Sequence, residues 1–107
     1  MKRKFDLYLA DILEAIDRVD EYTRDVDFDV FTKKKMAVDA VLRNLEIIGE
    51  AASQVPEEIK KKYVDIPWRD IQEFRIVVAH HYWSMNLERV WDIVQHKLSS
   101  LKEQVRS

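Results

Sequence analysis

Residues 74 to 86, FRIVVAHHYWSMN, place an arginine, two adjacent histidines and a tyrosine in an otherwise largely apolar stretch. Arg75 carries a permanent positive charge, His80 belongs to the residue type that titrates near neutrality, and Tyr82 supplies a hydroxyl. An arginine can hold the non-bridging oxygens of a phosphodiester and stabilise the negative charge that develops on them. A histidine can take the proton from a ribose 2′-hydroxyl or give one to the leaving 5′-oxygen. These groups therefore indicate metal-independent cleavage of RNA to a 2′,3′-cyclic phosphate.

Structural interpretations of the same residues stay open. An arginine near a packing face is commonly neutralised by a carboxylate, and Glu50 and Glu46 are the candidates, so Glu50 is an auxiliary site residue. His81 adds a second imidazole beside His80 and is the other auxiliary residue. Adjacent helical positions point about 100° apart, and no carboxylate stands at ligand spacing from the two histidines. We therefore expect neither a metal site nor a cofactor.

The elements that carry these residues are predicted to be helices. The 107 residues contain one Gly and two Pro, 47% are hydrophobic and 36% are charged, a composition typical of a helical protein. Apolar residues recur at spacings of three and four in four long stretches, and a short helix lies between the second and the third. The predicted helices cover about 5–19, 31–55, 56–63, 67–81 and 87–101. We expect an all-α fold, an antiparallel up-and-down helical bundle, formed by residues 1–107 as a single domain.

Two residues mark details of this bundle. Asp29 is the expected N-cap of the second long helix, because it follows the acidic break DVDFD. Gly49 lies within that helix, where glycine costs about 1 kcal/mol relative to alanine. A glycine there is expected to let another helix or a ligand come close.

The third long helix raises a geometric difficulty. Its apolar stripe runs through Trp68, Ile71 and Val78, and the same spacing includes Arg75 and Tyr82, so we expect Arg75 inside the packing stripe. On an ideal helix positions 75 and 80 are about 140° apart and positions 80 and 82 about 160°. Either the helix ends near position 80 and the chain turns back, or two copies meet across a two-fold axis and share one cleft. We expect a homodimer.

Charge and composition exclude several classes of protein. A net charge of −2 and a pI near 5.9 argue against a generally basic protein that coats nucleic acid. The absence of cysteine excludes disulfides and fits a reducing cytosol. Charged residues interrupt the opening segment, so no signal peptide is expected, and no apolar run approaches the roughly 20 residues of a membrane span. We expect a cytoplasmic protein without membrane contact.

The motif R-x-x-x-x-H-x-Y, from Arg75 through His80 to Tyr82, resembles the signature of HEPN-domain proteins, specifically of the HepT-like toxins. RNLEIIGEAASQVPEEIKKKY from position 43, IPWRDI from position 66 and NLERVWDIV from position 86 look like family blocks in the expected order. The resemblance implies a helical bundle that dimerises with its motifs facing a common cleft. It also implies a metal-independent endoribonuclease, with Arg75 and His80 as catalytic residues, that acts as the toxin of a toxin–antitoxin pair.

The resemblance further implies a partner, a minimal nucleotidyltransferase antitoxin of the MntA type that adenylylates Tyr82. A bulky anion at that position would block the cleft and repel the RNA phosphate. The sequence departs from the family at Ile76, because family members usually have a polar residue, commonly Asn, directly after the motif arginine. An alternative function is therefore a non-catalytic subunit that binds nucleotide or RNA for a minimal nucleotidyltransferase. A purely structural helical dimer is the third interpretation.

Overall fold

The computed structural model describes the backbone of residues 5–84 and 87–106, and the side chains of residues 6–79 and 87–106. All regular secondary structure in these ranges is helical, as the composition predicts. The elements are α1 (Phe5–Thr23), α2 (Phe28–Lys33), α3 (Lys35–Gln54), α4 (Glu57–Lys62), α5 (Trp68–Gln72), α6 (Phe74–Ser84), α7 (Leu87–Asp92), the π-helical turn η1 (Ile93–Lys97) and α8 (Leu98–Arg106).

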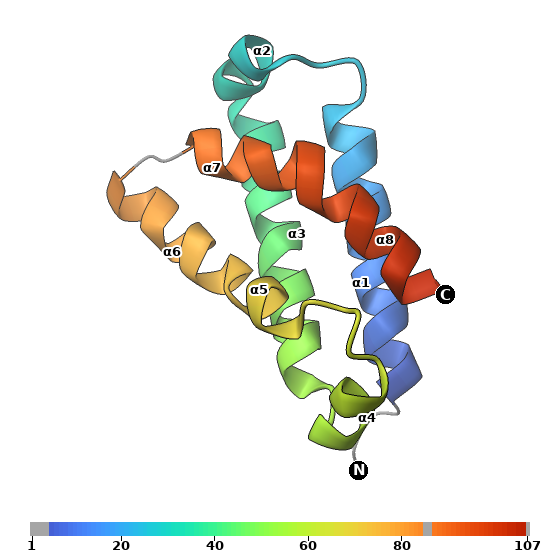
Figure 1. Ribbon diagram of the computed structural model, residues 1–107. Coiled ribbons are helices and arrows are strands. Elements are labelled where there is room, and N and C mark those ends of the chain that lie inside the picture. Colours follow the sequence, from blue (N-terminus) through green and yellow to red (C-terminus); the bar gives the residue numbers. More distant parts are fainter. Residues whose placement is uncertain (1–4, 85–86, 107) are drawn as a thin grey trace.

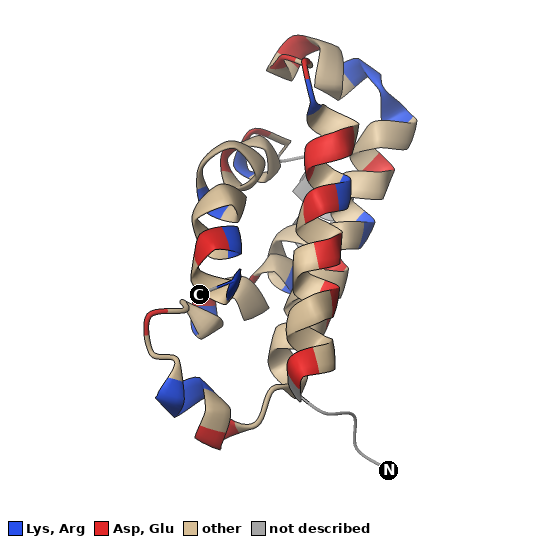
Figure 2. Ribbon diagram, turned by 90° about the vertical axis from the view of Figure 1, so that its right-hand side faces the viewer, with Lys and Arg blue, Asp and Glu red and all other residues tan. Residues whose placement is uncertain are grey.

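The two longest helices, α1 and α3, lie side by side and run in opposite directions (Figure 1). Ile12 and Ile16 of α1 and Leu45 and Ile48 of α3 are fully buried, which confirms the predicted inner faces. Burying a side chain of this size contributes roughly 1.5–3 kcal/mol, so this pair supplies much of the core. The outer face of α1 carries a row of acidic residues (Figure 2).

The start of the second predicted helix differs from the expectation. Asp27, not Asp29, is the N-cap of α2, and its side chain accepts a hydrogen bond of 2.8 Å from the Val30 N–H. Asp29 lies within the first turn. The predicted helix 31–55 is also interrupted, because Lys34 leaves the helical conformation with φ −95° and ψ 84°, and α3 begins after it.

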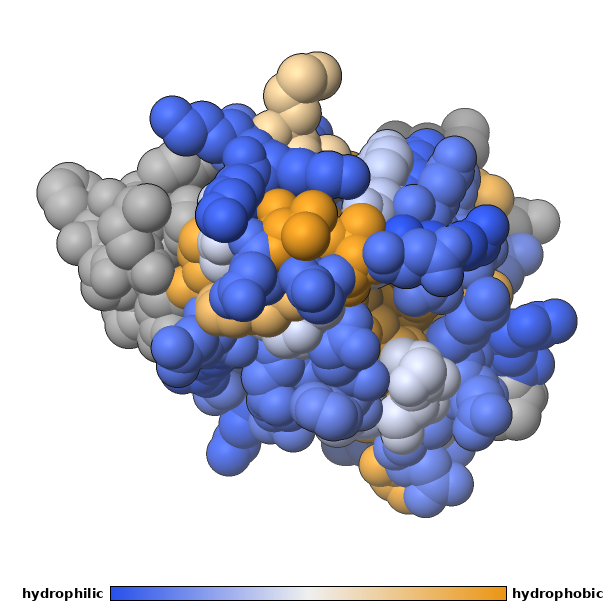
Figure 3. All heavy atoms as spheres, turned by 90° about the horizontal axis from the view of Figure 1, so that it is seen from above, coloured by the Kyte–Doolittle hydropathy of each residue, from blue (hydrophilic) through white to orange (hydrophobic). Residues whose placement is uncertain are grey.

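This turn lets α2 pack separately from α3. Phe31 is fully buried, and its ring centroid lies 4.9 Å from that of Trp91. Two apolar side chains near this turn are exposed to solvent, Val30 at 42% and Met36 at 88%. Figure 3 views this end of the molecule and shows an apolar patch among hydrophilic side chains.

The third predicted helix is divided at Glu73 into α5 and α6. Glu73 has ψ −13°, and its carbonyl accepts hydrogen bonds from the Ile76 N–H at 2.9 Å and from the Val77 N–H at 3.1 Å. The first of these bonds is of the 3₁₀ type and the second of the α type. The buried face runs through Ile71, Phe74 and Val78 at ordinary helical spacings of three and four, and position 75 lies at its edge. In Figure 1, α6 runs obliquely beside α3.

The last predicted helix is present, with one feature that the sequence pattern did not predict. Val90, Val94, Leu98 and Leu101 are buried, as expected from their spacing. Between α7 and α8 the chain forms the π-helical turn η1, whose wider winding accompanies burial of Ile93 directly beside Val94. None of the helices in the described part of the chain is both long and apolar enough to cross a membrane.

Candidate functional site

The helix α6 carries the whole R-x-x-x-x-H-x-Y motif. Its backbone is continuously helical from Phe74 to Ser84, so the chain does not turn back near position 80. The side chains of His80, His81 and Tyr82 lie outside the described residues. On one continuous helix positions 75 and 80 are about 140° apart around the axis and about 7.5 Å apart along it. Of the two solutions to the geometric difficulty, the structure therefore excludes the first.

Arg75 occupies a different environment from the one predicted. The expectation that it lies within the packing stripe is wrong, because its side chain is 53% exposed and the neighbouring Phe74 is the buried residue. The prediction of a carboxylate partner is confirmed, since Arg75 Nη1 lies 3.6 Å from Glu50 Oε2. The Glu50 side chain is itself 57% exposed, and ion pairs this accessible contribute about 0–1 kcal/mol. The guanidinium is therefore held only weakly and remains accessible to a stronger anion.

The aliphatic stem of Arg75 crosses the bare backbone of α3 at Gly49. A Cβ atom added to Gly49 would lie 2.7 Å from Arg75 Cγ and 3.3 Å from the carbonyl oxygen of Ile71. Contacts under 3.0 Å require one of the groups to move, so only glycine accommodates the stem in this position. The expected close approach at Gly49 is confirmed, and the approaching groups are the Arg75 stem and the backbone of α5.

Arg75 also forms the boundary between two hollows. One, which we call the α1–α3 cleft, has a volume of about 270 Å³ and lies among Tyr8, Asp11, Ile47, Gln54 and Arg75, with further residues of α3 between them. The other is a shallower hollow of about 680 Å³ beside α5 and α6.

The shallow hollow is lined by Arg69, Gln72, Ile76 and Ala79 in addition to Arg75. Ile76 is 55% exposed, so the residue at which the sequence departs from the resemblance faces solvent directly beside the motif arginine. Residue 76 and the motif arginine therefore line the same hollow.

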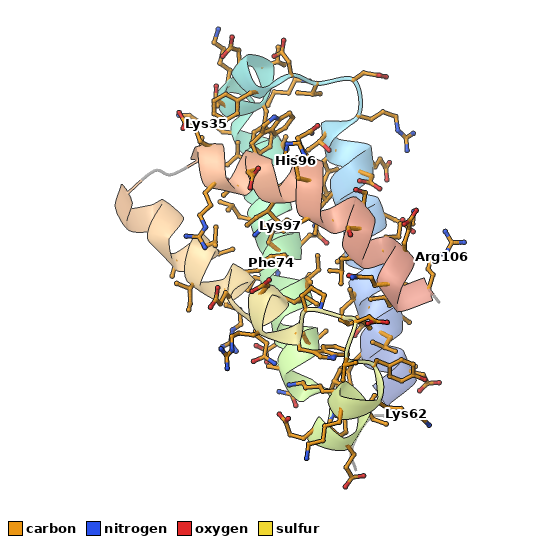
Figure 4. All side chains as sticks on the ribbon, in the orientation of Figure 1. Lys35, Lys62, Phe74, His96, Lys97 and Arg106 are labelled. Atoms are coloured by element: carbon orange, nitrogen blue, oxygen red, sulfur yellow. The ribbon has the colours of Figure 1, made fainter. Side chains whose placement is uncertain are left out.

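A further cleft lies away from the motif. It has a volume of about 220 Å³, and Phe74, His96 and Lys97 line it between the start of α6 and η1 (Figure 4). His96 is exposed, as its position on the outer side of the last helix predicts. In the part of the chain that the structure describes, no group of three or more histidine and acidic side chains is arranged to hold a metal ion.

Some residues of this region were not identified from the sequence. Asp11 lines the α1–α3 cleft together with Tyr8 and Gln54, a position that the apolar periodicity of the first helix does not indicate. Asn44 is only 4% exposed, and its Nδ2 donates a 2.8 Å hydrogen bond to the carbonyl of Ala40. Its buried Oδ1 has no hydrogen-bond donor among the described residues. A polar residue within an apolar helical stripe is the signal that identifies Asn44.

Comparison with known proteins identifies the family of this chain. The family model described as ribonuclease HepT-like matches residues 12–107. The chain belongs to the ribonuclease HepT-like family. This confirms the resemblance seen in the motif and its flanking blocks.

Several curated relatives of this HepT-like chain carry ribonuclease names. "Probable ribonuclease HepT" of Thermococcus cleftensis is 39% identical over 95% of this chain and 93% of its own length. "Putative RNase MJ0127" of Methanocaldococcus jannaschii is 40% identical over 95% of this chain and 85% of its own length. "Gamma-glutamylcyclotransferase and putative RNase MJ0434" of the same organism is 38% identical, and this chain spans about half of it, 47% of its length. No solved structure matches the chain.

The contact between Gly49 and Arg75 predicts a thermodynamic coupling. Gly49→Ala should leave the free energy of unfolding unchanged or lower it, because the new methyl group displaces the Arg75 stem and offsets the helix-propensity gain of about 1 kcal/mol. In an Arg75→Ala background the stem no longer obstructs the methyl group and the 3.3 Å contact with the Ile71 carbonyl remains, so Gly49→Ala should lower the free energy of unfolding less than in the wild type, or raise it. Urea unfolding of the four proteins in this double-mutant cycle measures the coupling, expected at about 1 kcal/mol. Equal effects of Gly49→Ala in both backgrounds would contradict the contact.

Proposed function

We propose that this HepT-like protein is a metal-independent endoribonuclease in which Arg75 and His80 are the catalytic residues. The observation that carries the proposal is the placement of Arg75. Its stem lies against Gly49, its guanidinium is exposed, and its pair with Glu50 is weak enough to exchange for a phosphate. Family membership and the relatives named as ribonucleases support the same activity.

The proposed reaction is an in-line attack of the ribose 2′-oxygen on the adjacent phosphorus. The imidazole of a His80 takes the 2′-hydroxyl proton as the O2′–P bond forms, and a protonated imidazole supplies the proton to O5′ as the P–O5′ bond breaks. Arg75 leaves Glu50 and donates hydrogen bonds to the non-bridging oxygens, whose negative charge increases in the transition state. The products are a 2′,3′-cyclic phosphate and a 5′-hydroxyl.

The proposed active form is a homodimer of two helical bundles. Because α6 is continuous, positions 75 and 80 of one chain point in different directions, and a second copy related by a two-fold axis can supply the missing group. We propose that Arg75 of one protomer and His80 of the other act on the same phosphate in a shared cleft. His81 and Glu50 are auxiliary, His81 as a further imidazole and Glu50 as the resting partner of Arg75.

The proposed physiological role is that of a cytoplasmic toxin neutralised by a minimal nucleotidyltransferase. Arg75 and Tyr82 are seven residues apart, so their positions on α6 differ by only about 20° around the axis. Position 82 therefore lies on the same face of α6 as the arginine that is to hold the RNA phosphate. The charge and bulk of an AMP group attached to Tyr82 would exclude RNA from the shared cleft of the dimer.

Ribonuclease activity is tested with purified protein and RNA in EDTA. Wild-type protein should cleave and leave cyclic-phosphate ends. Arg75→Ala should lower the rate on the order of 10²-fold or more, and His80→Ala roughly 10²- to 10⁴-fold. Arg24→Ala, which removes an exposed arginine from outside the two hollows beside Arg75, is the matched control and should leave the rate unchanged.

The stability of Arg75→Ala separates a functional from a structural role. Because the side chain is half exposed, its removal should change the free energy of unfolding by no more than about 1 kcal/mol. Loss of folding in Arg75→Ala, or wild-type rates in His80→Ala, would contradict the proposed roles.

If wild-type protein does not cleave, Ile76→Asn restores the polar residue usual at this exposed position. Failure of that variant as well would favour the alternative, a non-catalytic nucleotide- or RNA-binding subunit.

Modification of Tyr82 is tested by co-expression with a minimal nucleotidyltransferase of the antitoxin type. Intact-mass analysis should show AMP added to the wild-type protein and to Tyr63→Phe, in which a different exposed tyrosine is changed. The added mass should be absent from Tyr82→Phe. AMP retained in Tyr82→Phe would place the modification on another residue and contradict the proposed mode of inhibition.

A further inference from the structure

The α1–α3 cleft beside Arg75 is a second recognition element, to which neither the motif nor the family match assigns a role. We propose that it binds the nucleobase next to the phosphate held by Arg75, and that it favours bases whose edges offer N–H donors, guanine above all. The inference rests on the proposed ribonuclease function for its place in the reaction. The binding preference itself can be measured without any cleavage.

The size and the walls of the cleft suit one flat ring system. Its volume of about 270 Å³ lies just below the roughly 300–1,000 Å³ of clefts that hold drug-sized ligands. Ala51, which is buried, and Ile47, which is half buried, form the apolar part of the α3 wall of the cleft. Tyr8, also half buried against the core, contributes an aromatic ring from α1. Single-stranded RNA is commonly recognised by bases that stack on aromatic side chains in this way.

The polar groups of the cleft favour a base edge over a phosphate. Three carboxylates and one amide line it, from Asp11, Glu46, Glu50 and Gln54. The two arginines of the cleft are each paired already, Arg43 with Glu46 at 2.6 Å and Arg75 with Glu50 at 3.6 Å. A phosphate placed inside would face more negative than positive side chains, and like charges at this range repel. The same ion pairs engage the carboxylates of Glu46 and Glu50, and Asp11 has an interaction of its own. When Arg75 leaves Glu50 for the phosphate, as in the proposed reaction, the Glu50 carboxylate loses its partner and can accept hydrogen bonds from a neutral ligand that donates.

Among the four bases, guanine matches this set of acceptors best. Its N1–H and N2–H groups are adjacent and parallel, so one carboxylate can accept both. Adenine and cytosine each offer a single amino group toward such a carboxylate. Uracil offers one N–H between two carbonyl oxygens, which would have to face carboxylate oxygens without a donor. An unpaired acceptor in a polar site carries a large cost, so uracil should be bound least well.

Arg75 belongs both to the cleft and to the proposed catalytic site. The same side chain lines the α1–α3 cleft and the shallow hollow on its other side. A nucleotide whose base is bound in the cleft would therefore have its phosphate close to the Arg75 guanidinium. Recognition of the base would fix which phosphate along the strand is presented for cleavage.

The first test measures binding of 5′-GMP and 5′-UMP to the full-length protein by calorimetry or NMR titration. GMP should bind about tenfold or more tightly than UMP. Tyr8→Ala should weaken GMP binding roughly tenfold, because stacking on the ring is lost, whereas Tyr8→Phe should retain it. Tyr22→Ala, a change of an exposed tyrosine on the same helix, is the matched control and should leave GMP binding unchanged. Equal affinities for GMP and UMP would overturn the inference.

A second variant keeps the test decisive if Tyr8→Ala does not fold. Glu50→Gln preserves the shape of the side chain but removes the carboxylate that Arg75 leaves, so the ratio of GMP to UMP affinity should fall. An unchanged ratio in Glu50→Gln would contradict recognition by this acceptor. Cleavage-site mapping on RNA of random sequence separates the two proposals. GMP selectivity without cleavage would reject the ribonuclease function and leave the base site intact, whereas cleavage with no base preference would reject the base site alone.

Discussion

The contact between Gly49 and the Arg75 stem is the constraint on which the rest of the site depends. A side chain at position 49 would need the space that the stem occupies, since its Cβ would lie 2.7 Å from Arg75 Cγ. The glycine lets α5 and α6 approach α3 and directs the guanidinium to the surface between two hollows. The weak pair with Glu50 then keeps the charge accessible, which a fully buried partner would not.

The continuity of α6 determines how such an arginine can act with a histidine of the same motif. A helix that stays regular to Ser84 separates positions 75 and 80 around its axis, so a single chain cannot direct both toward one phosphate without distortion. In the proposed dimer a two-fold axis brings each motif against the other, so the second copy provides the missing group. In this proposal the two protomers together form the catalytic site, and the α1–α3 cleft within each protomer selects the RNA base.

The sequence predicted the features that depend on local spacing. The inner faces of α1 and α3, the short α4, the close approach at Gly49 and the carboxylate partner of Arg75 all follow from residue type and helical periodicity. The burial of Arg75 was predicted wrongly because spacings of three and four from Ile71 lead to both position 74 and position 75, and periodicity alone does not decide which of the two packs inward. The α1–α3 cleft could not be predicted, because Tyr8 and Gln54 meet only after α1 has packed on α3.

The central claim, that one site takes Arg75 and His80 from different protomers, is tested most directly by mixing two inactive variants. Assayed alone, Arg75→Ala and His80→Ala proteins should each cleave RNA at least about a hundredfold more slowly than wild type. After subunit exchange, half of the dimers are mixed and one of the two sites in each has both residues, so about a quarter of wild-type activity should return. Mixtures that stay as inactive as the separate variants, with exchange verified by native mass spectrometry, would contradict the shared site.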